Sequence, residues 1–126
     1  MAKNILVVED EDSVRQALSK ILENYGYCVT SAPDAEAGLK AFNAAACMDI
    51  VLTDLSLPGM SGWDLADAVK KRCPAVPVIL LSGWDVDQED VVKHKNVEMI
   101  LSKPVKIKDM LAAISKLTAL QTEDKG

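Results

Sequence analysis

The chain has 126 residues and a formal net charge of −5 at pH 7; 49% of its residues are hydrophobic and 26% are charged. This length and composition predict one globular domain, residues 1–126, with enough apolar side chains to build a core. The acidic balance argues against direct binding of nucleic acid, because phosphate contacts need basic side chains. No apolar run reaches the roughly 20 residues of a membrane span, and no signal peptide is recognisable. We therefore expect a cytoplasmic protein that does not bind membranes.

Five short apolar runs alternate with amphipathic segments, and this alternation predicts an α/β sheet of parallel strands. In the first helix, apolar residues recur at i, i+3 and i+4 and stop at Gly26, which suits a left-handed helix end. Asp34 is expected to cap the second helix. Ser61 or Gly62 is expected to begin the third helix, and Pro74 to end it. The predicted strands cover residues 4–9, 27–31, 49–53, 76–81 and 97–101. Helices are predicted around the apolar residues of 14–25, after the cap Asp34 with 37–42 inside the helix, from 61 or 62 to Pro74, at 85–94 and around 107–117.

The connections between these elements predict a (βα)5, flavodoxin-like, doubly wound sandwich with strand order 2-1-3-4-5. Right-handed crossovers place helices on both faces of such a sheet. Ligands bind beyond the carboxyl ends of the strands where the strand order reverses, here between strands one and three. The expected helix at 85–94 is short and offers little apolar surface, and the polar tail 121–126 is expected to fray.

Carboxylates lie at the ends of two of the predicted strands. Glu9 and Asp10 end the first strand and Asp54 ends the third. Neighbouring parallel strands lie about 4.8 Å apart, so these carboxylates should meet at one edge of the sheet. Clustered carboxylates repel one another, and a hard cation with oxygen ligands relieves that repulsion. We therefore predict a Mg²⁺ site formed by Glu9, Asp10, Asp54 and the backbone carbonyl of Ser56.

An aspartate beside Mg²⁺ can also attack a phosphoryl group and form an aspartyl phosphate. Asp54 is the candidate nucleophile. Lys103, after the fifth strand, is the candidate second cation for the phosphoryl oxygens, and Ser82, at the end of the fourth, offers them a hydroxyl. Four strand ends would thus supply an acid pair, a nucleophile, a hydroxyl and a lysine.

This set of residues resembles the receiver domain of two-component response regulators. The resemblance runs from Lys3 to about Leu120 and includes all five positions of the family pattern in order. The matching residues are Glu9-Asp10 after Ile-Leu-Val-Val, Asp54 with Pro58 and Gly62 following it, Ser82-Gly83, and Lys103-Pro104.

The resemblance implies a signalling switch, not an enzyme, that assists its own phosphorylation and dephosphorylation. Asp54 would accept a phosphoryl group from a sensor histidine kinase or a histidine phosphotransfer protein. Mg²⁺ would be bound at Asp10 and Asp54 with help from Glu9, Ser82 would sense the phosphoryl group, and a cis Lys103-Pro104 peptide would turn the lysine inward. A downstream protein would bind the face from strand four to helix five. We expect a stand-alone receiver that is a monomer or a weak dimer.

Two departures from the family pattern support an alternative. Ile100 stands where the family often has an aromatic residue, and the segment 85–94 is unusually polar. A degenerate receiver that acts as a phosphorylation-independent binding module is therefore the second hypothesis. A flavodoxin-like redox protein is disfavoured because the acids of residues 9–12 repel a flavin phosphate. An aspartyl-type phosphatase needs a second acid two residues after Asp54, where this chain has Ser56.

Overall fold

The computed structural model describes residues 3–45, 48–83 and 96–125, and their side chains up to residue 119. Within these ranges the chain forms five strands and four helices. The label α4 is kept for the predicted helix at 85–94, which lies outside the described residues. The elements are β1 (Asn4–Val8), α1 (Asp12–Asn24), β2 (Cys28–Ala32), α2 (Ala35–Ala44), β3 (Ile50–Asp54), α3 (Gly62–Arg72), β4 (Val78–Ser82), β5 (Met99–Ser102) and α5 (Ile107–Lys125).

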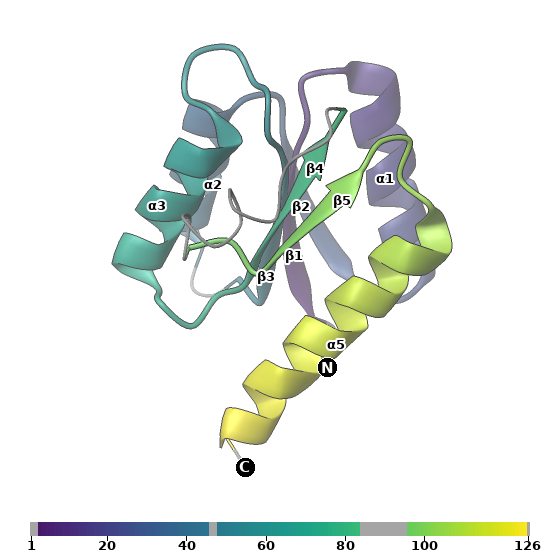
Figure 1. Cartoon of the computed structure of the whole chain (residues 1–126), viewed down its shortest axis with the longest axis vertical. Helices are drawn as coiled ribbons and strands as arrows, with labels where there is room; N and C mark the ends of the chain where they lie inside the picture. The colour runs from purple at the N-terminus through teal and green to yellow at the C-terminus, as the bar shows by residue number, and fades with distance from the viewer. Residues whose placement is uncertain (1–2, 46–47, 84–95, 126) are drawn as a thin grey trace.

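The five strands are parallel and follow the order β2-β1-β3-β4-β5, as the sequence predicts. Helices α2 and α3 cover one face of the sheet, and α1 and α5 cover the other (Figure 1). The register pairs Val8 of β1 with Thr53 of β3, and Asp54 of β3 with Leu81 of β4. The carboxyl ends of the three central strands therefore lie at the same edge of the sheet.

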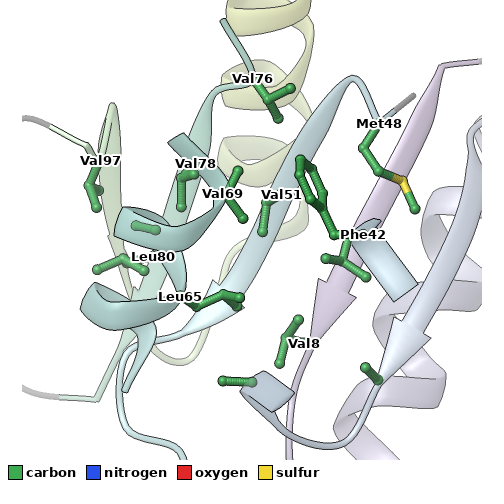
Figure 2. Close-up of a cluster of buried hydrophobic side chains, with 14 residues drawn as sticks. Val8, Phe42, Met48, Val51, Leu65, Val69, Val76, Val78, Leu80 and Val97 are labelled. Carbon is green, nitrogen blue, oxygen red and sulfur yellow. The ribbon is translucent and has the colours of Figure 1, made fainter. Parts of the chain in front are cut away.

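The sheet separates two apolar clusters, because alternate residues of each strand point to opposite faces. Every residue of β3 and β4 is buried, as expected for central strands covered on both sides. Figure 2 shows the cluster under α2 and α3, where Leu65 and Val69 of α3 pack over Val51 and Leu80. The cluster under α1 and α5 comprises Ile5, Val7, Leu18, Leu22, Ile50, Leu52, Ile79, Leu81, Met110, Ala113 and Ile114.

The predicted helix signals are confirmed by the structure. The Asp34 side chain accepts a 2.7 Å hydrogen bond from the amide of Ala37 and so caps α2. Gly26 follows α1 with φ +93°, the left-handed conformation that glycine adopts without strain. Ser61 caps α3 in a reciprocal arrangement with Asp64, and α3 ends before Pro74.

Most elements begin and end within one or two residues of their predicted bounds, and the end of α5 lies further from its prediction. Strand β5 begins at Met99 and not at residue 97, while β4 runs on to Ser82. Helix α5 continues to Lys125, further than the predicted helix, and fraying of the tail at 121–126 stays a prediction. Residues 119–125 include alanine, leucine, glutamine and glutamate, which favour helix, and no glycine or proline interrupts them. Among the helices of the described ranges, none is both long enough and apolar enough to cross a membrane.

Candidate functional site

Two buried carboxylates meet at the carboxyl edge of the sheet. Glu9 directly follows β1 and is 1% exposed, and Asp54 is the last residue of β3 and is 3% exposed. The Glu9 amide still donates to the carbonyl of Ala32 at 3.1 Å, which extends the β1–β2 pairing by one residue. Asp10, the next residue, is exposed. One carboxylate oxygen from each of these three acids lies within 4.8 Å of the other two, as the strand ends predict.

Lys103 brings a positive charge to the two buried carboxylates, those of Glu9 and Asp54. Its Nζ lies 3.0 Å from Oε1 of Glu9 and also makes an ion pair with Oδ1 of Asp54. The Lys103 amide donates to the carbonyl of Ser82 at 2.8 Å, so the backbone of this lysine is tied to the end of β4. The Lys103-Pro104 peptide is cis, as the resemblance implied. The ammonium group thus bridges the ends of two strands that are not its own.

The charges of these groups depend on one another. Burial raises the pKa of Asp54 to about 7, and the neighbouring Glu9 adds to this effect while Lys103 opposes it. Burial also acts to raise the pKa of Glu9, but hydrogen bonds with Asp54, the Glu11 amide and Lys103 outweigh it and lower that pKa to about 2. The pKa of Asp10 is raised, mainly by its contact with Glu9. Near neutral pH the carboxylates of Glu9 and Asp54 therefore share one proton for part of the time. Binding of a further cation would displace this proton.

The site fits a hard divalent cation. Three carboxylates from two neighbouring strands can each offer one oxygen, and Mg²⁺ prefers such ligands together with water. Oδ1 of Asp54 supports this reading, because it is buried and, apart from its ion pair with Lys103, has no hydrogen-bond partner among the described residues. The Lys103 ammonium is shared between this oxygen and Glu9, so one positive charge faces two buried carboxylates and a further cation would be favourable.

The two predicted serines lie at the same edge. Ser82 is the last residue of β4, is 2% exposed, and pairs in register with Ser102 of β5. Ser56 lies two residues beyond Asp54 in the loop before α3 and is exposed. The role of the Ser82 hydroxyl and that of the Ser56 carbonyl as a metal ligand stay predictions.

Two contacts that matter at this edge, one of Arg15 and one of Gly62, were not predicted from the sequence. Nη1 of Arg15 donates to the carbonyl oxygen of Glu9 at 2.9 Å, beside the acid cluster. Gly62 lies so close to the end of β3 that an added Cβ would be 2.3 Å from the carbonyl oxygen of Asp54. Gly62 belongs to the family pattern, but the pattern does not reveal this close approach. Arg15 gave no stronger signal than its i+3 spacing from Asp12.

A groove opens beside the site, between α1 and the segment after β5. Its volume is about 340 Å³, and apolar side chains form most of its wall. Lys103, which pairs with Glu9 and Asp54, is one of the residues that line this groove. The lining residues are Glu11, Ser13, Val14, Ala17, Leu18, Leu81, Lys103, Pro104 and Val105.

A doubly wound parallel sheet with three acids and a lysine at its switch point defines a class of α/β protein that binds charged ligands beyond its strand ends. Comparison with protein families is more specific. The model of the response regulator receiver domain matches residues 5–115 of this chain. The chain therefore belongs to this family, and it is a signalling module of two-component systems.

Related proteins and solved structures agree with this assignment. The sensory transduction protein RegX3 of Mycobacterium tuberculosis (strain H37Rv) is 36% identical over 112 residues, which cover 88% of this chain and 48% of that protein. The chain thus spans about half the length of such curated relatives. A CheY-like receiver from Methanospirillum hungatei superposes with TM-score 0.89 at 29% identity and full coverage of both chains. The response regulator TrrA of Thermotoga maritima, solved in complex with Mg²⁺ and BeF, has TM-score 0.82 at 29% identity and covers 91% of this chain and 98% of its own.

Proposed function

We propose that this receiver is a phosphoacceptor in a two-component phosphorelay, with Asp54 as the residue that takes the phosphoryl group. The observation that carries the proposal is the surroundings of Asp54. This carboxylate is buried, lies within one cation's reach of two other acids, and is paired with a lysine from a third strand end. A purely structural carboxylate would need only one of these partners.

Each residue has a distinct part in the proposed transfer. Glu9, Asp10, Asp54 and the backbone carbonyl of Ser56 are the ligands that would hold Mg²⁺. When bound, this ion supplies positive charge for the phosphoryl oxygens and favours the ionised form of Asp54. Lys103 supplies a second positive charge to the same oxygens, and the Ser82 hydroxyl donates a hydrogen bond to one of them.

The chemistry is a displacement at phosphorus. A carboxylate oxygen of Asp54 attacks the phosphorus of a phosphohistidine, and the bond between phosphorus and the ring nitrogen breaks. The nitrogen leaves with the electron pair and is protonated, and the phosphoryl group remains on Asp54. The raised pKa of Asp54 means that the nucleophile must first lose its shared proton, and nearby positive charge favours that loss.

The partners we propose follow from this chemistry. A sensor histidine kinase or a histidine phosphotransfer protein is the donor, and the groove along α1, which Lys103 lines, is the surface on which we expect it to dock. A downstream protein would respond through the face from β4 to α5. Ile100 of β5 is partly buried against the core under α2 and α3. Because Ile100 stands where the family often has an aromatic residue, we expect switching to rely on movement of Ser82.

Acetyl phosphate labelling tests the assignment directly. With Mg²⁺ present, the wild-type chain should gain the mass of one phosphoryl group, and Asp54→Asn should lose this label. Asp109→Asn, which removes an exposed carboxylate from the first turn of α5, is the matched control and should label like the wild type. Intact-mass spectrometry measures all three proteins.

The alternative outcomes are distinct. A label that persists in Asp54→Asn contradicts the assignment of the acceptor. If the wild type binds neither Mg²⁺ nor beryllofluoride and takes no label, the chain is a degenerate receiver that acts as a binding module. Tryptophan fluorescence and calorimetry measure the two ligands separately.

A further inference from the structure

Arg15 is a cation beside the acidic turn that has no part in the proposed transfer. It lies on α1, where its Nη1 donates to the Glu9 carbonyl oxygen at 2.9 Å and its Nη2 makes an ion pair with Asp12. We propose that Arg15 is a positioning residue that holds the Glu9–Asp10 peptide, and with it two carboxylates of the Mg²⁺ site. This inference rests on the proposed function of that site.

The geometry of the peptide explains why one bond can matter. A peptide group is planar, so fixing the Glu9 carbonyl oxygen also fixes the amide of Asp10 and the Cα atoms on either side. The two metal-ligating side chains leave from those Cα atoms. Glu9 lies one residue beyond the last paired residue of β1, and a backbone carbonyl that is not paired within the sheet needs a partner from elsewhere. Arg15 is that partner.

Two other hydrogen bonds hold the two ends of the turn, and the bond from Arg15 holds the peptide between them. The Glu9 amide donates to Ala32 at 3.1 Å, which fixes the turn on the strand side. The Glu11 amide donates to Oε2 of Glu9 at 3.1 Å, which fixes the turn on the helix side. Between them lies the peptide that Arg15 contacts. Loss of the guanidinium would let this peptide rotate. The rotation would move Asp10 more than Glu9, because the Asp10 side chain is exposed and that of Glu9 is buried.

An arginine suits this position better than a lysine. The planar guanidinium can reach the Glu9 carbonyl and the Asp12 carboxylate with two different nitrogens at once. A lysine would keep the charge but offers one ammonium nitrogen for both acceptors. The Arg15 side chain is only 16% exposed, so the rest of its stem is packed and its head is held in one direction. The Asp12 side chain is 77% exposed, and such a pair adds little by charge alone.

Charge and positioning predict opposite effects on metal binding. Arg15 carries a positive charge close to a site for a divalent cation, so by Coulomb repulsion alone its removal should tighten Mg²⁺ binding. If Arg15 positions the ligands, its removal should weaken Mg²⁺ binding, because misplaced carboxylates no longer converge. The sign of the change in Mg²⁺ affinity therefore separates the two roles.

Arg72 provides a matched control for Arg15. It is also a helical arginine whose guanidinium donates to a backbone carbonyl, that of Asn43 at 3.2 Å, but it links α3 to α2. We expect Arg15→Ala to weaken Mg²⁺ binding by about tenfold, Arg15→Lys to weaken it less, and Arg72→Ala to leave it within about twofold of the wild type. Isothermal titration calorimetry measures the four dissociation constants. Amide hydrogen exchange without metal should be faster at Asp10 and Glu11 in Arg15→Ala alone.

Each outcome decides a separate question. An unchanged or tighter dissociation constant in Arg15→Ala overturns the positioning role, and so does equal weakening in Arg72→Ala. If the wild type binds no Mg²⁺, the proposed function of the site fails, and the exchange rates without metal then decide the inference: unchanged rates overturn it. Should Arg15→Ala fail to fold, Arg15→Lys keeps the stem and the charge, and a constant equal to that of the wild type would overturn the need for the guanidinium fork.

Discussion

At the scale of single residues, the site gains its properties from burying charge. Glu9 and Asp54 are both almost fully buried, and Lys103 supplies one positive charge for two carboxylates. Burial, and then the neighbouring Glu9, raise the pKa of Asp54 to about 7, because one ammonium group does not neutralise both acids. Without metal, the two buried carboxylates lack a second positive charge. Ionised Asp54 therefore lowers the stability of the fold, and a bound cation would offset this loss.

The cost should appear as a dependence of stability on pH. The folded chain binds a proton at Asp54 up to about pH 7, whereas the unfolded chain loses it near the ordinary aspartate pKa of 3.8. Between these values the folded state binds more protons, so the free energy of unfolding falls as pH rises from about 4 to 7. The lowered pKa of Glu9 acts in a different window, below about pH 4.5.

Asp54→Asn should remove this dependence. Without Mg²⁺, we expect the variant to be more stable than the wild type by about 2 kcal/mol at pH 8, with the gain shrinking toward pH 4. Urea unfolding at several pH values in the presence of a chelator measures the difference. Glu23→Gln, which removes an exposed carboxylate from α1, should show no such gain. A variant that is no more stable than the wild type at pH 8 would show that Lys103 already balances the charge of Asp54.

The sequence predicted the site residues whose position follows from strand ends. Glu9, Asp54 and Lys103 each come directly after or at the end of an apolar run, and parallel pairing brings such ends together. Arg15 could not be predicted in this way. It lies on a helix among polar neighbours, as a solvated arginine would, and its contact is with a backbone carbonyl that has no signature in the sequence.

At the scale of elements, the connection from β3 to α3 is built around a close backbone contact. The Gly62 amide donates to the carbonyl of Leu55 at 2.9 Å, which folds the loop back onto the end of β3. The capping box of Ser61 and Asp64 starts α3 at the same place. The loop that carries Ser56 is therefore closed by Gly62, the first residue of α3. The loop can adopt this shape because glycine has no Cβ.

Gly62→Ala should be strongly destabilising. The added Cβ would lie 2.3 Å from the carbonyl oxygen of Asp54 and 2.9 Å from Cα of Leu55, and both are backbone atoms that cannot move aside. We expect a loss of about 3 kcal/mol, which exceeds the gain in helix propensity. Gly83→Ala is the matched control, because a Cβ there meets nothing within 4 Å. Thermal and urea unfolding compare the two, and equal stability would mean that the loop can open without cost.

Element boundaries were predictable where a side chain or a glycine marks them, and less so elsewhere. Asp34, Ser61 and Gly26 act through local bonds and backbone conformation, and the structure confirms all three. Strand ends depend on which neighbour continues to pair, so β4 extends to Ser82 beyond the predicted end. The apolar stripe of the last helix ends at Leu117, but the helix itself runs on to Lys125, because residues of good helix propensity follow the stripe.

At the scale of the whole molecule, one sheet shares its two faces between two apolar clusters. Leu80 and Val51 belong to the cluster under α2 and α3, while their strand neighbours Leu81 and Leu52 belong to the one under α1 and α5. Neither cluster can be lost without exposing one face of the same central strands. Burying a single large side chain contributes about 1.5–3 kcal/mol, so exposing a whole face would unfold the domain. We therefore expect the two faces to unfold together.

Two conservative truncations on opposite faces test this expectation. Val69 of α3 and Ile114 of α5 are each fully buried, one in each cluster, with the sheet between them. We expect Ile114→Val to cost about 1 kcal/mol and Val69→Ala about 2 kcal/mol. Because the two sites share no partner, the double variant should lose the sum within about 0.5 kcal/mol and keep a single transition with an unchanged m-value. Urea unfolding followed by fluorescence and by circular dichroism measures both quantities. Separate transitions for the two probes would show that each face of the sheet can lose its helices while the other persists.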